Sequence, residues 1–162
     1  MKTFVSVVLA GLIVWLVSPQ LPNPPDIKKA GKAVSDILQD NISEGEKVTL
    51  EYKTFELINQ YREEKRLGAL KWNDNLHSLA IKHSTYMSET GKFQHSSYNY
   101  YENIFKGESY GVKGIPEVAL ETWQNSPGHN SILLNKSISS GSIGIAKTKG
   151  LDYDTYVTFM AD

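Results

Sequence analysis

The chain opens with an apolar pattern, because residues 4–17 carry no charge and follow Lys2. This run is shorter than the roughly 20 residues of a comfortable membrane-spanning helix, and its position is typical of the apolar region of a signal peptide. The following Val17-Ser18-Pro19-Gln20 matches a small-x-small cleavage site poorly. For residues 1–18, two interpretations stay open: a cleaved signal peptide, or a retained signal-anchor helix with local thinning of the bilayer. Both predict an exported protein, either secreted or anchored to the cell membrane by this segment.

A polar, proline-rich pattern follows in residues 19–48. Four prolines between positions 18 and 26 favour an extended, polyproline-like spacer. Apolar residues then recur at helical spacing from Ile27 to Leu38, but Gly31 weakens this helix. We interpret it as a marginal helix or stalk that residues 43–47 bring to an end.

From residue 49 to residue 162 the pattern predicts one compact domain that starts with helices. A period of three to four residues from Tyr52 to Tyr61 predicts a helix that ends at Leu67-Gly68. A second helix is predicted between an N-cap at Asn73 or Asp74 and Gly91, with its apolar face at Leu76, Leu79, Ala80, His83 and Met87. A third begins at Pro116 and ends before Pro127.

The C-terminal third changes to strand patterns. Residues 142–147 alternate, residues 153–160 are rich in β-formers, and a glycine-containing turn separates them, which predicts a hairpin. A third strand is expected around Tyr98–Ile104. Helices followed by antiparallel strands predict an α+β domain with helices packed on a small sheet.

Composition narrows the classes of function. The 162 residues are 40% hydrophobic and 22% charged, which suits one globular core rather than two domains. A formal net charge of −1 without a basic stripe argues against a nucleic-acid partner. The chain has no cysteine, which excludes disulfides, thiolate metal sites and thiol catalysis.

The four histidines divide into two pairs. His77 is interpreted as a solvated surface histidine and His83 as a core or boundary histidine, and no His-Glu-x-x-His zinc-protease motif is present. His95 and His129 instead follow helix ends, beside glycine and serine, where binding groups concentrate. Together with Glu102 they form a candidate set for a divalent metal such as zinc, or for acid–base chemistry. Spacing alone does not bring these three residues together.

Several motifs resemble the CAP superfamily of cysteine-rich secretory, antigen 5 and pathogenesis-related proteins, and its short bacterial branch above all. They occur in the order of that family and cover about two-thirds of the chain. The matching segments are Asn59-x-x-Arg62 with Leu67-Gly68, Leu70-x-Trp72-Asn73 with Leu76, Leu79-Ala80 and His83, Gly91-x-Phe93-x-His95-Ser96, Glu102-Asn103-Ile104, Trp123-x-Asn125-Ser126-Pro127-Gly128-His129, and Ile143-Gly144-Ile145-Ala146.

The resemblance implies an α-β-α sandwich with a small antiparallel sheet, whose cleft holds two histidines and two acids and binds zinc in some members. Here it implies His95 and His129 as the histidines and metal ligands, and Glu102 as the first acid. Ser126 stands where the second acid lies in the animal branch, and Glu121 points elsewhere on its helix. Ser126 can hydrogen-bond a ligand or water, or simply start the Ser126-Pro127-Gly128 turn.

Two functions follow as hypotheses. The first is a non-enzymatic extracellular binding module whose cleft takes a small apolar or cell-envelope ligand, or a protein. Aromatic residues near the cleft suit such ligands: Phe93, Tyr98, Tyr100, Tyr101, Phe105 and Tyr110. The second is a metal-dependent peptidase or esterase that uses zinc on His95 and His129 with Glu102. The missing second acid favours the first hypothesis.

Overall fold

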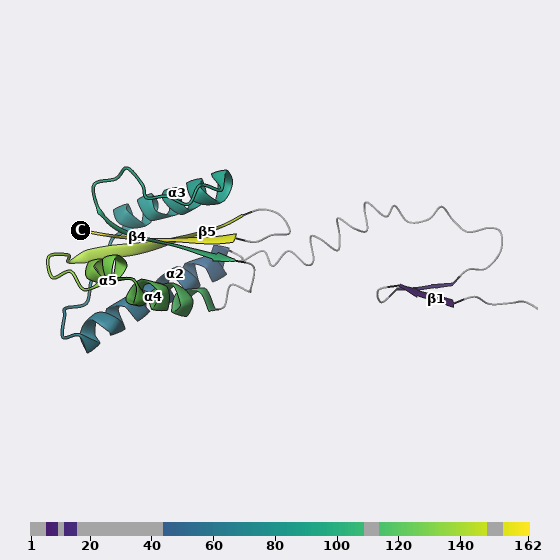
Figure 1. Ribbon diagram of the computed structural model, residues 1–162, viewed down its shortest axis with the longest axis horizontal. Coiled ribbons are helices and arrows are strands. Elements are labelled where there is room, and N and C mark those ends of the chain that lie inside the picture. The colour runs from purple at the N-terminus through teal and green to yellow at the C-terminus, as the bar shows by residue number, and fades with distance from the viewer. Residues whose placement is uncertain (1–5, 10–11, 16–43, 109–113, 149–153) are drawn as a thin grey trace, which may run out of the picture. The chain divides into compact units, whose positions relative to one another are not determined.

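A computed structural model describes residues 6–9, 12–15, 44–108, 114–148 and 154–162 (Figure 1). The chain divides into two compact units, Met1–Gln39 and Asp40–Asp162. We describe each unit by itself. The proline-rich spacer and the helix expected after Ile27 lie outside the described residues.

In the first unit, strands β1 (Ser6–Leu9) and β2 (Leu12–Trp15) pair antiparallel, with Ser6 opposite Trp15. The sequence predicted an apolar helix here, and the structure differs. The reason lies in the residue types, because β1 contains Val7 and Val8, β2 contains Ile13 and Val14, and β-branched residues favour extended backbone. Within the described ranges, no helix is both long and apolar enough to cross a membrane.

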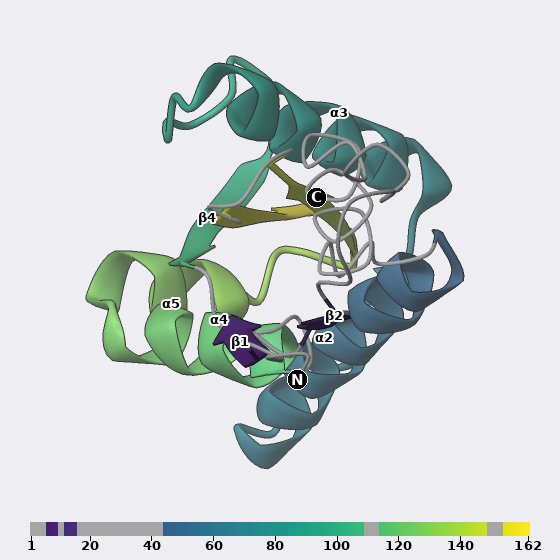
Figure 2. The same cartoon turned by 90° about the vertical axis from the view of Figure 1, so that its right-hand side faces the viewer.

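The second unit is the predicted α-β-α sandwich. Its sheet has the order β3-β5-β6-β4, formed by β3 (Lys71–Trp72), β4 (Tyr101–Glu108), β5 (Ser140–Lys147) and β6 (Asp154–Ala161). Figure 2 shows α3 (Asp74–Thr90) on one face of the sheet, and α2 (Glu44–Glu64), α4 (Ile115–Asn125) and α5 (Pro127–Leu133) on the other.

The predicted hairpin is confirmed, since β5 and β6 pair antiparallel from Gly141↔Ala161 to Lys147↔Thr155. The third expected strand is β4, which pairs with β6 along its whole length. The two-residue β3 was missed, and it pairs parallel with β5, so the sheet is mixed rather than antiparallel. A two-residue strand is too short to show an alternating pattern in the sequence.

Helix α2 differs from its predicted bounds at both ends. Residues 44–47 begin this helix instead of ending an earlier one, and Glu44 and Glu46 lie in its first turn, where negative charge is favourable. At the other end, Arg66 rather than Gly68 adopts the left-handed conformation, with φ 61°. The N–H of Leu67 then donates to the carbonyl of Arg62.

The caps of α3 and the end of α4 are as predicted. The side chain of Asn73 accepts hydrogen bonds from the N–H groups of Asn75 and Leu76, and Gly91 closes α3 with φ 69°. Helix α4 ends at Asn125, two residues before Pro127. The sequence predicted a turn after Ser126, but residues from Pro127 form α5, because proline suits the first turn of a helix.

The sheet separates two layers of core. Between the sheet and α2 and α4 lie Trp123, Phe55, Phe159 and their neighbours, while Met87 and Leu76 of α3 pack on the other face. Gly144 of β5 touches the backbone of α3 so closely that a Cβ there would overlap Ala80 and Ile81. The indole N–H of Trp123 donates to the carbonyl of Ile104, 3.0 Å away, which ties α4 to β4.

Candidate functional site

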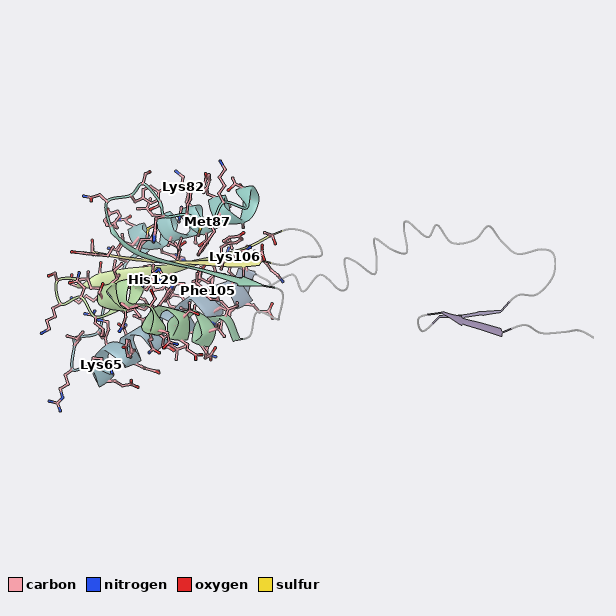
Figure 3. All side chains as sticks on the ribbon, viewed as in Figure 1. Lys65, Lys82, Met87, Phe105, Lys106 and His129 are labelled. Carbon is pink, nitrogen blue, oxygen red and sulfur yellow. The ribbon has the colours of Figure 1, made fainter. Side chains whose placement is uncertain are left out.

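Strand β4 carries the carboxylate of the candidate site. Alternate residues of a strand point to opposite faces. Ile104 packs with Met87 on the α3 side, whereas Phe105 belongs to the core on the α4 side (Figure 3). Glu102 therefore faces α3, and its side chain is only 7% exposed. The next residue, Asn103, faces α5, where its amide donates to the carbonyl of His129.

Glu102 is held by the loop that precedes its strand. Its Oε1 lies 2.7 Å from Nδ1 of His95 and accepts the backbone N–H of Ser96 at 3.0 Å. An ionised carboxylate only accepts hydrogen bonds, so Nδ1 of His95 carries a proton and donates it. Whenever the ring is uncharged, the lone pair is therefore on Nε2 of His95. The His95 side chain is 59% exposed, so a ligand can approach the ring.

His129 approaches from α5, on the other side of β4 (Figure 3). Its Nδ1 is buried and has no hydrogen-bond partner among the described residues. Burial lowers the pKa of His129 below its ordinary value, and the neighbouring charge of His95 lowers it further. His129 is therefore a neutral imidazole at pH 7, which is the form that binds metals and accepts protons.

The fold brings all three predicted residues together. The ring centroids of His95 and His129 lie 6.5 Å apart. Two imidazoles on one tetrahedral zinc ion, with Zn–N bonds of about 2.0–2.1 Å, have centroids roughly 5 Å apart. Across the described ranges, no three His, Cys, Asp or Glu side chains already stand in metal-binding geometry. The chemistry of the donors fits a divalent ion, and the two rings need a rotation that closes roughly 1 Å.

Ser126 lies three residues before His129, between α4 and α5. Its backbone N–H donates to the carbonyl of Trp123, and its own carbonyl accepts from Asn130. The side chain makes no capping hydrogen bond at the start of α5 and is half-buried. Its observed contacts are thus those of a helix junction. Glu121 is exposed on α4.

The other two histidines have different outcomes. His83 is buried, as predicted. His77 was predicted to be a solvated surface residue, and this is wrong: its Nε2 lies 2.8 Å from Oε2 of Glu51. Glu51 is 1% exposed, and its Oε1 accepts the N–H of Ile145 in β5. Sequence analysis missed Glu51, although it continues the buried face of α2 that includes Phe55 and Ile58.

The aromatic residues that were expected near the site also have different outcomes. Phe93, Tyr100 and Tyr101 have exposed side chains on the loop before β4 and at its start. Tyr98 is half-buried against the start of α3. Phe105 was expected at the cleft but belongs to the core, because it points to the other face of β4. Tyr110 lies outside the described residues.

Comparison with known proteins now adds the family. Residues 55–161 match the cysteine-rich secretory protein (CAP) family. The chain belongs to this family. The match spans His95, Glu102 and His129, so the candidate site lies wholly within the family domain.

One curated protein is similar to this chain in sequence, and several solved structures are similar to it in fold. An uncharacterized membrane protein of Bacillus subtilis, YlbC, is 28% identical over 127 residues, which are 70% of this chain but 35% of that protein. The chain thus spans about a third of the curated relative it matches. An extracellular SCP-domain protein of Bacillus anthracis superposes with a TM-score of 0.58 at 22% identity, over 77% of this chain and 44% of the other. An outer surface protein of Borrelia burgdorferi superposes with a TM-score of 0.50 at 17% identity, over 67% of this chain and 88% of the other.

Proposed function

We propose that this CAP protein is an extracytoplasmic binding module whose cleft at His95, Glu102 and His129 takes a small ligand or a divalent metal without turning over a substrate. One observation carries the proposal. The contact between Nδ1 of His95 and Glu102 leaves Nε2 available on a mostly exposed side chain, and the neutral ring of His129 lies beside it.

The metal role rests on the type and arrangement of these donors. A histidine that donates one nitrogen to a carboxylate and offers the other outward is the usual arrangement of a metal-binding histidine. His95 and His129 would hold the ion, and Glu102 would orient His95. Zinc is one of the divalent ions that imidazole ligands suit. A bound ion supplies a Lewis acid to which an oxygen of the ligand can bind.

The location rests on the sequence and on the names of the relatives. The uncharged run at residues 4–17 is typical of export segments. One relative is named a membrane protein, and two proteins of the same fold are named as extracellular and outer-surface proteins. We therefore propose that the domain works outside the cytoplasm, either secreted or held at the membrane by residues 1–18.

The proposed ligand is small and apolar, a cell-envelope component, or a protein. Its support is the exposed aromatic side chains of Phe93 and Tyr100, which lie on the loop that carries His95, and of Tyr101 at the start of β4. Aromatic side chains that remain exposed contribute apolar contact area to bound partners. The absence of a carboxylate at position 126 favours binding over catalysis.

The test is to compare stabilisation with turnover. The full chain is incubated with zinc and with lipid and glycan fractions of a bacterial envelope, and its melting temperature is measured, since a ligand of the native state raises it. The same preparations are screened with peptide and ester libraries. We expect stabilisation without turnover. Hydrolysis that disappears in Glu102→Gln would contradict the proposal and support the metal-dependent hydrolase instead.

A further inference from the structure

A third histidine lies directly behind the candidate cleft. His83 is on the inner face of α3, and its side chain is only 6% exposed. The ring of Tyr86 is stacked against the His83 ring, with 6.2 Å between the ring centroids and an interplanar angle of 14°. A polar ring buried this deeply needs hydrogen-bond partners, so its contacts are informative.

One contact fixes the backbone next to His95. Nε2 of His83 lies 2.8 Å from the carbonyl oxygen of Gln94. A carbonyl oxygen only accepts, so Nε2 of His83 carries a proton and donates it. Gln94 immediately precedes His95, and this hydrogen bond therefore anchors to α3 the loop segment that presents His95.

The other contact concerns Glu102. Its Oε2 is buried and has no hydrogen-bond partner among the described residues. Nε2 of His83 lies 3.9 Å from this oxygen. This separation is too long for a hydrogen bond, but it places the polar edge of His83 beside the oxygen that His95 leaves unpaired. A buried carboxylate oxygen is costly without such compensation.

We propose that His83 is a positioning residue of the candidate site: its Nε2–H holds the Gln94 carbonyl that directly precedes His95, and so keeps Nδ1 of His95 on Glu102 and Nε2 of His95 toward the ligand. The inference deepens the proposed function, because it concerns the same site. It also has a consequence that needs no ligand, since the protonated nitrogen of His95 can be observed directly.

The test compares two substitutions of His83 in the full chain. In His83→Gln the amide nitrogen takes the place of Nε2 and can still donate to Gln94. His83→Leu fills the space without a donor, and His83→Asn, which is too short to reach Gln94, replaces it if the leucine variant does not fold. His77→Gln and His77→Leu form the matched control pair, because His77 also contacts a buried glutamate but lies outside the cleft.

The first readout is the long-range ¹H–¹⁵N spectrum at about pH 8, where imidazoles are neutral. We expect His95 to be protonated on Nδ1 in the wild type and in His83→Gln, and to exchange between both tautomers in His83→Leu. The second readout is zinc affinity, which should fall about tenfold or more in His83→Leu and recover in His83→Gln. The His77 variants should change neither.

The two proposals fail separately. An unchanged His95 tautomer in folded His83→Leu would overturn the role of His83, whatever zinc does. If the wild type binds no zinc while the His95 tautomer still depends on His83, the metal part of the proposed function falls and the positioning role stands.

Discussion

Nδ1 of His95 and Oε1 of Glu102 lie 2.7 Å apart, and this contact joins the loop after α3 to the edge strand β4. It decides which nitrogen of His95 remains free. The same pairing recurs between His77 and Glu51, where the histidine is mostly buried and the carboxylate also accepts a backbone N–H. The His95 side chain is mostly exposed to solvent, whereas the His77 side chain is mostly buried. This difference in exposure distinguishes the candidate site from a structural contact.

The pKa of His129 depends on burial and on His95. We expect His95→Asn, which keeps a donor toward Glu102 but carries no charge, to raise the pKa of His129 without restoring its ordinary value. The charge of His95 is the smaller cause of the lowering and burial is the larger one, which the substitution leaves in place. An NMR titration of His129 measures both values, and an unchanged pKa would show that His95 exerts no field there.

The same shift makes stability depend on pH. The unfolded chain protonates His129 near its ordinary value of 6.5, while native His129 stays neutral to a lower pH. As the pH falls from about 6.5 toward the lowered pKa, the unfolded state binds more protons and the free energy of unfolding decreases. Urea unfolding between pH 7.5 and 5 should show a shallower decrease in His129→Gln than in the wild type. Equal slopes would contradict this prediction.

Gly144 is required by the close packing of β5 on α3. A Cβ at this position would overlap the backbone of Ala80 and Ile81, which cannot move aside as a flexible side chain can. We expect Gly144→Ala to lower the free energy of unfolding by at least about 2 kcal/mol. Gly68→Ala is the control, because a Cβ at Gly68 meets nothing within 4 Å. Similar effects of the two substitutions would argue against this packing.

Glu51 and His77 should be energetically coupled. Glu51 is buried and links α2 to α3 through His77 and to β5 through the N–H of Ile145. A double-mutant cycle of Glu51→Ala and His77→Ala should give a coupling energy of about 1–2 kcal/mol. The exposed Glu56 on the same helix offers the control cycle with His77→Ala, which should show coupling near zero. Additive effects of Glu51 and His77 would refute the contact.

Much of the fold could be predicted because its signals are local. The N-cap at Asn73, the left-handed Gly91 and the end of α4 before Pro127 each depend on a few neighbouring residues. Elements that depend on partners far away in the sequence were not predicted. The parallel pairing of β3 with β5 joins segments about seventy residues apart. A strand of two residues is too short for its sequence pattern to predict this pairing.

At the candidate site too, local signals were read correctly, and contacts between residues far apart in the sequence were not. The positions of His95 and His129 after helix ends, beside glycine and serine, made them candidates together with Glu102, but only the resemblance to the CAP family predicted that the three residues meet. The contact of His77 with Glu51 was missed because a histidine beside an apolar helix face looks solvated until the neighbouring helix is known. The buried arginine Arg62 likewise has no local signal for its role, which is to donate to carbonyls at the end of α5 and beyond.

The most direct test of the cleft is a zinc titration of the full chain by calorimetry. We predict that the wild type and His77→Gln release binding heat, and that His95→Ala and His129→Ala do not, although both keep the wild-type circular dichroism spectrum. Zinc binding that persists in both cleft variants, or no binding in the wild type, would contradict the assignment of His95 and His129 as the metal-binding pair.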